Sequence, residues 1–246
     1  MKRTVLLGTE LDALSLEEAV NRAMAEMELR RSAYVVTPNA EMLVSARRNP
    51  ALCGAVNGAA LSLPDGIGVL LVSRILGTPI SDRVTGIDFA AALMDEMAKK
   101  RMRVYLLGAR EGVGRAAEQR LCARYPALVI AGVSNGYADL LDEERLISRI
   151  NASGADLLLV CLGSPKQELW MQRNAPRLQV GLMAGLGGTL DVFAGHVRRA
   201  PALWRKSGLE WLYRLIRQPW RIGRVMRIPQ LFFAAICTKI GGNRER

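Results

Sequence analysis

The sequence predicts an α/β fold, in which a mostly parallel sheet carries helices on both faces and a helical appendage follows at the C-terminus. Short apolar runs alternate with helical segments, which is the pattern of parallel strands joined by helical crossovers. Half of the 246 residues are hydrophobic, enough to cover such a sheet on both faces. A change in charge near residue 197 separates the appendage from the α/β body.

The net charge of +11 is concentrated at the C-terminal end of the chain. Residues 1–196 hold 22 Lys and Arg against 21 Asp and Glu, whereas residues 197–246 hold 12 against 2. We therefore predict a near-neutral body over residues 1–196 and a basic appendage over residues 197–246. Basic segments of this kind bind polyanions, either nucleic acid or the anionic lipid of a membrane surface.

The first half of the chain opens with a predicted hairpin and a capped helix. Ser15 and Glu18 have the spacing of a capping box, so a helix is expected to begin at Leu16. Each later apolar run ends in a turn-forming residue, and an amphipathic segment follows it. The predicted strands of this half are residues 5–7, 11–13, 33–36 and 60–63, and the predicted helices are 16–29, 40–48, 67–76 and 87–100.

The second half alternates more clearly between strands and helices. Asp142 is predicted to cap a helix that ends near residue 152, and another helix is expected after Pro165. The run 156–161 is apolar throughout, as a buried parallel strand is. The predicted strands of this half are residues 104–107, 128–133, 156–161 and 180–183, and a further helix is predicted at 112–125.

The segment 162–168 has the features of a phosphate site. Ser164 is predicted to cap the following helix, and Pro165 to occupy its first position, where no intrahelical N–H bond is lost. Such a helix start presents free N–H groups and the positive end of a dipole. Lys166 and Gln167 add side-chain donors. An ordinary connection between a strand and a helix is the alternative interpretation.

Polar residues and glycines follow six of the predicted strands. In a parallel sheet the carboxyl ends of the strands meet at one edge, where ligands bind. We therefore expect one composite site there. The segments that would form it are 37–39, 64–66, 108–110, 135–137, 164–167 and 185–191.

Asp65, between Pro64 and Gly66, is the candidate general base, because a partly desolvated carboxylate can take a proton from a hydroxyl group. A turn or capping aspartate is the alternative. Thr37 and Asn39 are expected to cap the helix that begins at residue 40, a role that is compatible with a place in the site. Arg83 is either a surface residue or a cation for a diphosphate leaving group.

Other chemistries are disfavoured by the sequence. The glycine spacing of residues 108–114 does not match a dinucleotide fingerprint, which argues against a nucleotide-binding oxidoreductase. The chain has a single histidine, His196, and no Asp-x-Asp pair, so neither a metal nor another cofactor is expected. The four cysteines are far apart, and no apolar stretch reaches the roughly 18 residues of a spanning helix. We expect a cytoplasmic protein.

The appendage carries its arginines in a helical pattern. Arg214, Arg217, Arg221 and Arg224 recur at spacings of 3, 4 and 3, which places them on one helical face, although Pro219 should break or kink the helix near residues 217–218. Tryptophan, leucine and isoleucine fill much of the remaining surface. This composition favours a helix lying on anionic lipid over an RNA-binding segment, and a helix docked to the body is the alternative.

The ordered motifs of the chain resemble the WecG/TagA/CpsF family, glycosyltransferase family 26. The resemblance covers most of the chain and implies a Rossmann-like sheet, with inverting, metal-independent transfer of a sugar from a UDP-sugar to an undecaprenyl-diphosphate-linked GlcNAc acceptor. N-acetylmannosamine is the implied sugar, and UDP-glucose or UDP-ManNAcA the alternative donors. The motifs are TPNAE at 37–41, PDG at 64–66, RVTG at 83–86, YLLGA at 105–109, LGSPKQE at 162–168, GGTLD at 187–191, RAP at 199–201 and GLEWLYRL at 208–215.

The resemblance also implies roles for single residues. Asp65 matches the base, Thr37 and Asn39 the sugar pocket, and Tyr137 and Asp191 the nucleoside contacts. The tail arginines match an appendage that closes over the site on the inner face of the cell membrane, and a homo-oligomer is left open. The expected site is Asp65 and Thr37 as catalytic residues, with substrate contacts from Asn39, Arg83, Gly108, Tyr137, Lys166, Gln167, Gly188, Asp191, Arg214, Arg221 and Arg224.

Overall fold

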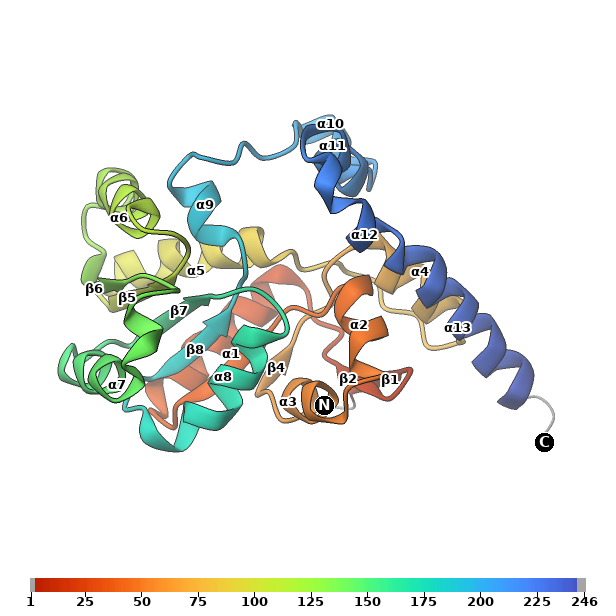
Figure 1. The fold of residues 1–246 in the computed structure, drawn as a ribbon, viewed down its shortest axis with the longest axis horizontal. Helices are drawn as coiled ribbons and strands as arrows, with labels where there is room; N and C mark the ends of the chain where they lie inside the picture. Colours follow the sequence, from red (N-terminus) through yellow and green to blue (C-terminus); the bar gives the residue numbers. More distant parts are fainter. Residues whose placement is uncertain (1–2, 243–246) are drawn as a thin grey trace.

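The computed structural model describes residues 3–242, without the side chains of Lys206, Arg221 and Arg224. Its centre is a six-stranded sheet in the order β4-β3-β8-β7-β5-β6, and every pair of neighbours is parallel (Figure 1). The predicted α/β class is confirmed. The strands of this sheet are β3 (Ala33–Val36), β4 (Leu61–Ser62), β5 (Arg103–Gly108), β6 (Val129–Ser134), β7 (Leu157–Cys161) and β8 (Leu182–Gly185).

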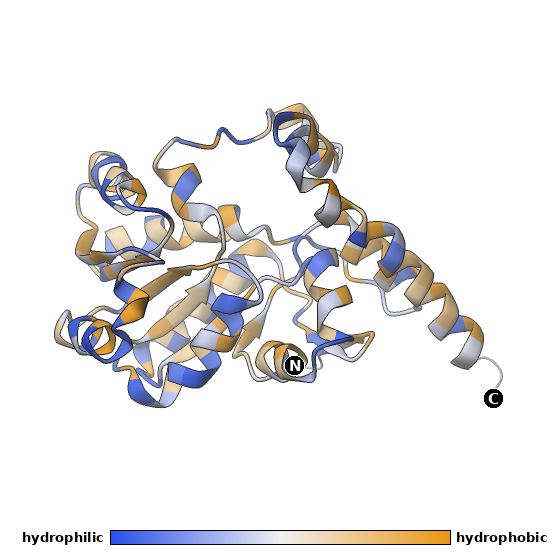
Figure 2. Ribbon diagram, viewed as in Figure 1, coloured by the Kyte–Doolittle hydropathy of each residue, from blue (hydrophilic) through white to orange (hydrophobic). Residues whose placement is uncertain are grey.

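Helices cover both faces of this sheet because successive side chains of a strand point to opposite faces. In β7, Leu157 and Leu159 pack into the core beneath one layer of helices, and Leu158 and Val160 into the core beneath the other. Figure 2 shows the resulting concentration of hydrophobic residues in the strands. The first layer consists of α1 (Leu16–Glu28), α5 (Gly86–Lys99), α6 (Val113–Arg124) and α9 (Thr189–Phe193), and the second of α3 (Pro50–Asn57), α7 (Glu143–Ala152) and α8 (Lys166–Asn174).

Two local predictions were wrong. Ser164 does not cap α8, because the Gln167 N–H that a serine cap would take already donates to the Gly163 carbonyl at 2.9 Å. The predicted helix 40–48 ends at residue 46 as α2 (Ala40–Ala46), and α3 follows it. Asn49 caps α3 through the Leu52 N–H, with Pro50 at the first position, so an Asn-Pro start signal was overlooked.

The appendage is helical and is interrupted at Pro219, as predicted. It consists of α10 (Ala202–Lys206), α11 (Glu210–Arg217), α12 (Ile222–Val225) and α13 (Arg227–Gly242), with a 3₁₀ turn at Pro219–Arg221. Arg214 and Arg217 therefore lie on α11, whereas residues 221 and 224 belong to later elements. The expectation of four arginines on one helical face was wrong, because a proline in that register ends the helix.

The last helix of the appendage is docked on the body. Leu231 and Ala235 of α13 are buried in a third apolar core, where they meet Leu43 of α2 and Val69 of α4 (Ile67–Ile75). Figure 1 shows α13 running beside α2 and α4 at one end of the molecule. Within residues 3–242, no helix combines the length and the apolar character that a membrane crossing requires.

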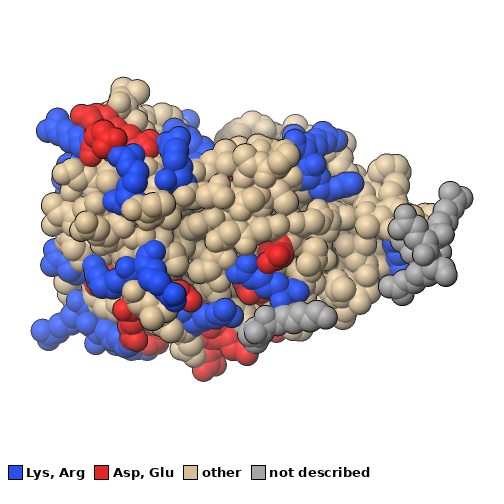
Figure 3. Space-filling view, turned by 90° about the horizontal axis from the view of Figure 1, so that it is seen from below, with Lys and Arg blue, Asp and Glu red and all other residues tan. Residues whose placement is uncertain are grey.

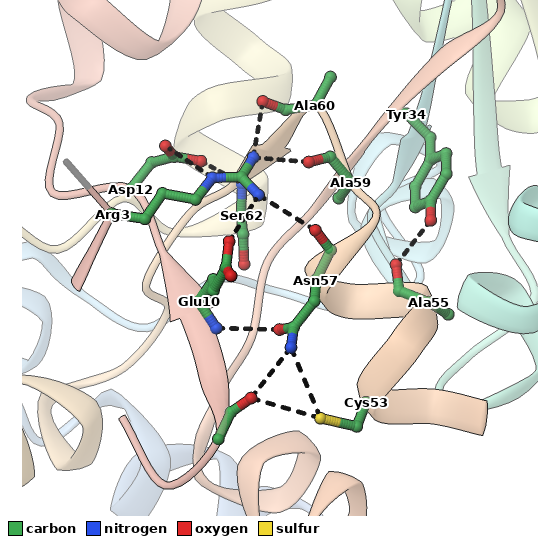
Figure 4. Close-up of polar contacts among 11 residues, drawn as sticks. Arg3, Glu10, Asp12, Tyr34, Cys53, Ala55, Asn57, Ala59, Ala60 and Ser62 are labelled. Atoms are coloured by element: carbon green, nitrogen blue, oxygen red, sulfur yellow. Dashed lines mark hydrogen bonds and ion pairs between the residues drawn. The ribbon is translucent and has the colours of Figure 1, made fainter. Parts of the chain in front are cut away.

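A short hairpin, β1 (Thr4–Leu6) and β2 (Thr9–Leu11), protects the exposed edge of the sheet at β4. The Asp12 carboxylate accepts the Ser62 N–H at 2.8 Å, and the Ser62 carbonyl accepts the Asp12 N–H at 2.8 Å. Arg3 donates to Asp12 and to the carbonyls of Ala59 and Ala60 (Figure 4). This clamp fixes the strand that leads directly to residue 65.

Replacing Asp12 by alanine is expected to lower the free energy of unfolding by about 1–3 kcal/mol, because a buried Ser62 N–H loses its acceptor. Urea denaturation measures the change. Glu10→Ala is the matched control: Glu10 also pairs with Arg3 but is more exposed, so its removal is expected to cost less than about 1 kcal/mol. Equal effects of the two substitutions would contradict this account of the clamp.

Candidate active site

Asp65 lies just beyond β4, and hydrogen bonds hold it at the edge of the sheet. Its N–H donates to the Pro38 carbonyl at 2.9 Å, which joins it to the loop after β3. Its carboxylate accepts the Gly86 N–H, the first of α5, at 3.3 Å. Gly66 then turns the chain into α4 with φ = +97°, a conformation that residues with a side chain rarely adopt.

The surroundings of Asp65 make it a stronger base than an ordinary aspartate. Burial of the carboxyl group raises its pKa to about 6, even though the Gly86 N–H, Arg214 and Arg83 favour the charged form. Glu210 acts in the same direction as burial. A carboxylate with a pKa near 6 is ionised at neutral pH and retains more affinity for a proton than one with the usual value.

Thr37 and Asn39 lie on the loop after β3, whose Pro38 carbonyl accepts the Asp65 N–H. Thr37 is buried beside Gly86, where an added Cβ would lie 3.4 Å from the Thr37 Oγ1. Asn39 caps α2 by accepting the Met42 N–H at 3.1 Å, as predicted, and stays exposed at the edge of the sheet. The loop that carries both residues is thus joined to Asp65 through Pro38, and Thr37 also lies beside the glycine whose N–H the Asp65 carboxylate accepts.

Arginines from three segments gather around the same carboxylate. Arg83 acts on Asp65 and donates to the Arg205 carbonyl at 3.3 Å, which ties it to α10. Arg199 donates to Asp88 and to Thr85, the N-cap of α5. Burial opposes ionisation of Asp88, but the hydrogen bonds from Arg199 and Thr85 outweigh it and hold its pKa below the usual value.

The appendage reaches this group through α11. Arg214 donates to Glu210 at 2.6 Å, and the charges of both residues act on Asp65. Arg214 was predicted from the sequence as a substrate contact, whereas Glu210 and, as a site residue, Arg199 were not. A signal for Glu210 was available, because it is one of only two acidic residues among residues 197–246.

A second group of candidates surrounds a pocket of about 220 Å³ at the ends of β5 and β6. Its lining includes Gly108, Arg110, Gly112 and Asn135. Gly108 is required by space, because an added Cβ would lie 2.3 Å from the Cys161 carbonyl oxygen. The pocket adjoins a switch point of the sheet, since β5 leads to α6 on one face and its neighbour β7 to α8 on the other.

Tyr137 and Lys166 line a separate, mostly apolar groove of about 790 Å³ between the loop after β6 and α8, together with Leu141 and Trp170. Gly188 precedes α9, and Asp191 lies in its first turn. Burial, with a smaller contribution from Asp191, raises the pKa of the Cys161 thiol to about 12, which places Asp191 near the end of β7.

Gln167 holds two loops together. Its side-chain oxygen accepts the N–H groups of Gly163 at 3.1 Å and Gly187 at 3.0 Å. Its amide nitrogen donates to Glu168 at 2.7 Å. Glu168 is fully buried, and burial raises the pKa of its carboxyl group above the usual value. The buried Gln167 side chain thus fixes the loops after β7 and β8 through its own hydrogen bonds.

The candidates form a track along the carboxyl edge of the sheet, ordered by their strands. Asp65 follows β4, and Thr37 follows β3; the 187–191 segment, Lys166, Gly108 and Tyr137 follow β8, β7, β5 and β6. The side chains of Arg221 and Arg224 lie outside the part of the chain that the structure describes. Among the described side chains, no three His, Cys, Asp or Glu residues are grouped in a way that could hold a metal ion.

A comparison with known families shows which family the chain belongs to. The model described as the glycosyl transferase WecG/TagA/CpsF family matches residues 4–245, nearly the whole chain. The chain belongs to the WecG/TagA/CpsF family of glycosyltransferases. The resemblance found in the sequence motifs is confirmed, and membership argues against the oxidoreductase and RNA-binding alternatives.

This glycosyltransferase is also similar to a characterised protein. It is 35% identical, over 210 residues, to the N-acetylglucosaminyldiphosphoundecaprenol N-acetyl-beta-D-mannosaminyltransferase of Bacillus spizizenii (strain ATCC 23059 / NRRL B-14472 / W23). The match covers 85% of this chain and 81% of the relative. The family model, which reaches residue 245, includes both the α/β body and the appendage.

Asp65→Asn is expected to change the free energy of unfolding by an amount that depends on pH. Relative to wild type, the change should favour the variant at pH 7.5 by on the order of 2 kcal/mol more than it does at pH 4.5. Because the pKa of Asp65 is raised in the folded state, the folded protein binds a proton between about pH 4 and pH 6 that the unfolded chain releases, and stability is lost as the pH rises through this window. Urea denaturation at the two pH values measures the difference.

The matched control is Asp82→Asn, an exposed carboxylate on the same loop as Arg83. It is expected to change stability little at either pH. If Asp65→Asn had the same effect at pH 4.5 and pH 7.5, the raised pKa of Asp65 would be refuted.

Proposed function

We propose that this glycosyltransferase moves N-acetylmannosamine from a UDP-sugar to GlcNAc-diphosphoundecaprenol, with inversion and without a metal or cofactor. The printed name of the Bacillus spizizenii relative supports the transferred sugar and the acceptor. The observation that carries the proposal is the carboxyl group of Asp65, with a pKa near 6, set among Arg83, Arg199 and Arg214. A base beside several cations suits a displacement that deprotonates a hydroxyl group and releases a diphosphate.

In the proposed reaction Asp65 takes the proton of the acceptor hydroxyl while the hydroxyl oxygen attacks the anomeric carbon. The bond from that carbon to the UDP oxygen breaks on the opposite side, and the electron pair leaves with UDP. A single displacement inverts the configuration and needs one base. The guanidinium groups of Arg83 and Arg214 would offset the negative charge that develops on the diphosphate.

The order of residues along the sheet edge orients the donor in this proposal. The pocket beside Gly108 would take the nucleotide, with Asp191 and Tyr137 close to the nucleoside. The sugar would then extend toward Thr37, Asn39 and Asp65 at the other end of the track. A donor made of a nucleoside, a diphosphate and a sugar is elongated, so a row of loops suits it better than a compact pocket does.

The appendage would lie on the inner face of the cell membrane. Many of its large apolar side chains are exposed, which is typical of a surface that meets lipid or protein. On the face seen in Figure 3, basic and acidic side chains are interspersed among uncharged ones. The most exposed apolar side chains of the appendage, with exposed fractions above 60%, are Leu203, Ile216, Trp220 and Phe233.

A UDP-release assay with several UDP-sugars and a GlcNAc-diphospho-lipid acceptor tests the proposed reaction. UDP-N-acetylmannosamine is expected to give the fastest acceptor-dependent release, and UDP-glucose and UDP-ManNAcA slower release. Asp65→Asn is expected to lower turnover about 10²–10⁴-fold, because the amide keeps the shape of the side chain but cannot take the proton. Asp82→Asn is the control. A folded Asp65→Asn variant with near-normal turnover would show that Asp65 is not the base.

Turnover is expected to be unchanged by EDTA, because arginines provide the charge for the departing diphosphate in this mechanism. The rate of the same assay with EDTA, and then with added Mg²⁺ or Mn²⁺, measures this. Loss of activity in EDTA and its recovery with either ion would contradict a metal-independent reaction.

Replacing Ile216 and Trp220 together by serine is expected to weaken binding to anionic liposomes about tenfold or more, because both side chains would lose apolar burial. Liposome sedimentation measures the partition. The matched control is Leu29→Ser, an exposed leucine of the body. Undiminished binding of the double variant would show that this part of the appendage does not contact lipid.

A further inference from the structure

The segment that enters α11 packs directly against the turn that carries Asp65. A Cβ added to Gly208 would lie 3.4 Å from the Ile67 Cγ1, two residues after Asp65. At the start of α13, Ile228 approaches Gly68 in the same turn, at 3.9 Å from the position of an added Cβ. The appendage therefore meets the base through backbone and side-chain packing as well as through charge.

Glu210 lies two residues after Gly208, in the segment that packs on this turn. It is the first residue of α11 and is 7% exposed, although it is charged and lies in a basic appendage. Arg214, one turn later, donates to its carboxylate at 2.6 Å. Burial removes hydration from the Glu210 carboxylate, which costs free energy. One ion pair with a half-exposed arginine does not offset this cost well, which suggests that Glu210 has a further role.

The charged groups facing Asp65 are few. Arg83 faces it from the loop before α5, Arg199 from the segment before α10, and Glu210 and Arg214 from α11. Arg199 is already paired with Asp88 at the start of α5. Glu210 is a carboxylate whose charge raises the proton affinity of Asp65.

We propose that Glu210 is a positioning residue for the reaction: packing of the segment before α11 on the turn after Asp65 buries its carboxylate, which holds the Arg214 guanidinium at the site. This inference rests on the proposed role of Asp65 as the base. A second negative charge nearby stabilises the protonated form of Asp65. This is the form that Asp65 has after the acceptor has attacked. Arg214, which Glu210 holds, has the larger and opposite effect on Asp65, so the two residues of α11 would set the proton affinity of Asp65 together.

The test is a titration of the Asp65 carboxyl carbon by NMR in the full-length protein labelled with ¹³C-aspartate. The signal is assigned by its absence in Asp65→Asn. Glu210→Gln is expected to lower the titration midpoint, and Arg214→Gln to raise it, because the two variants remove charges of opposite sign. Glu96→Gln is the matched control: Glu96 pairs with Lys99 on the surface of α5, and its removal should leave the midpoint unchanged.

Activity gives a second readout. If the midpoint falls from about 6 to about 5, the deprotonated fraction of Asp65 at pH 5 rises about fivefold. The ratio of kcat/KM for Glu210→Gln over wild type should therefore be about fivefold larger at pH 5 than at pH 7.5. A variant that only disturbed packing would lose activity equally at both pH values.

An unchanged midpoint in a folded Glu210→Gln protein would overturn the proposal, and so would a fall in the midpoint for Arg214→Gln. If Glu210→Gln fails to fold, the opposite shift expected for Arg214→Gln still decides whether this pair acts on Asp65. The NMR titration needs no substrate. Absence of turnover with every donor would therefore count against the proposed function and leave the measured coupling between Glu210 and Asp65 intact.

Discussion

A parallel sheet cannot leave either face in water, because each of its crossovers needs a helix packed on it. This constraint shapes the whole body of the protein. Helices from different crossovers cover the two faces, and all strands point the same way, so their carboxyl ends meet along one edge. The two-residue strand β4 contributes few hydrogen bonds to the sheet but leads to Asp65. It keeps its place because the hairpin clamp of Arg3 and Asp12 covers its free side.

The site combines opposing electrostatic effects at this edge. Enclosure of Asp65 favours its neutral form, whereas Arg83, Arg214 and the Gly86 N–H favour its charged form, and the outcome is a carboxyl group that titrates near neutrality. Full desolvation without cations would leave Asp65 protonated, and the same cations in open solvent would make it a weak base. The appendage contributes to both sides of this balance, since it supplies Arg214 and Glu210 and also covers the turn after β4.

Local signals in the sequence predicted most of the fold. The Ser15–Glu18 capping box and the run 33–36 each predicted an element that the structure contains, because these signals depend on neighbours in the chain. The loss of the Ser164 cap could not be predicted, since it depends on a hydrogen bond from Gln167 to the Gly163 carbonyl in a folded loop. The same holds for Gln167, whose partner Gly187 follows another strand. Asp65 and Thr37 could be placed because both directly follow strands. Glu210 is distant in sequence from Asp65, and only the packing of Gly208 on Ile67 shows their relation.

The appendage is fastened at both of its ends, and this has a kinetic consequence. Arg199 binds the start of α5 before α10 begins, and Leu231 anchors α13 in the third core after α12 ends. The segment between these anchors is therefore a closed loop, in which detachment of α11 costs only local contacts and the free segment remains at high effective concentration near the sheet edge. Opening and closing of α11 can then occur without release of the appendage from the body. In the proposed reaction, a long lipid-linked acceptor could enter and leave in this way while the protein stays folded.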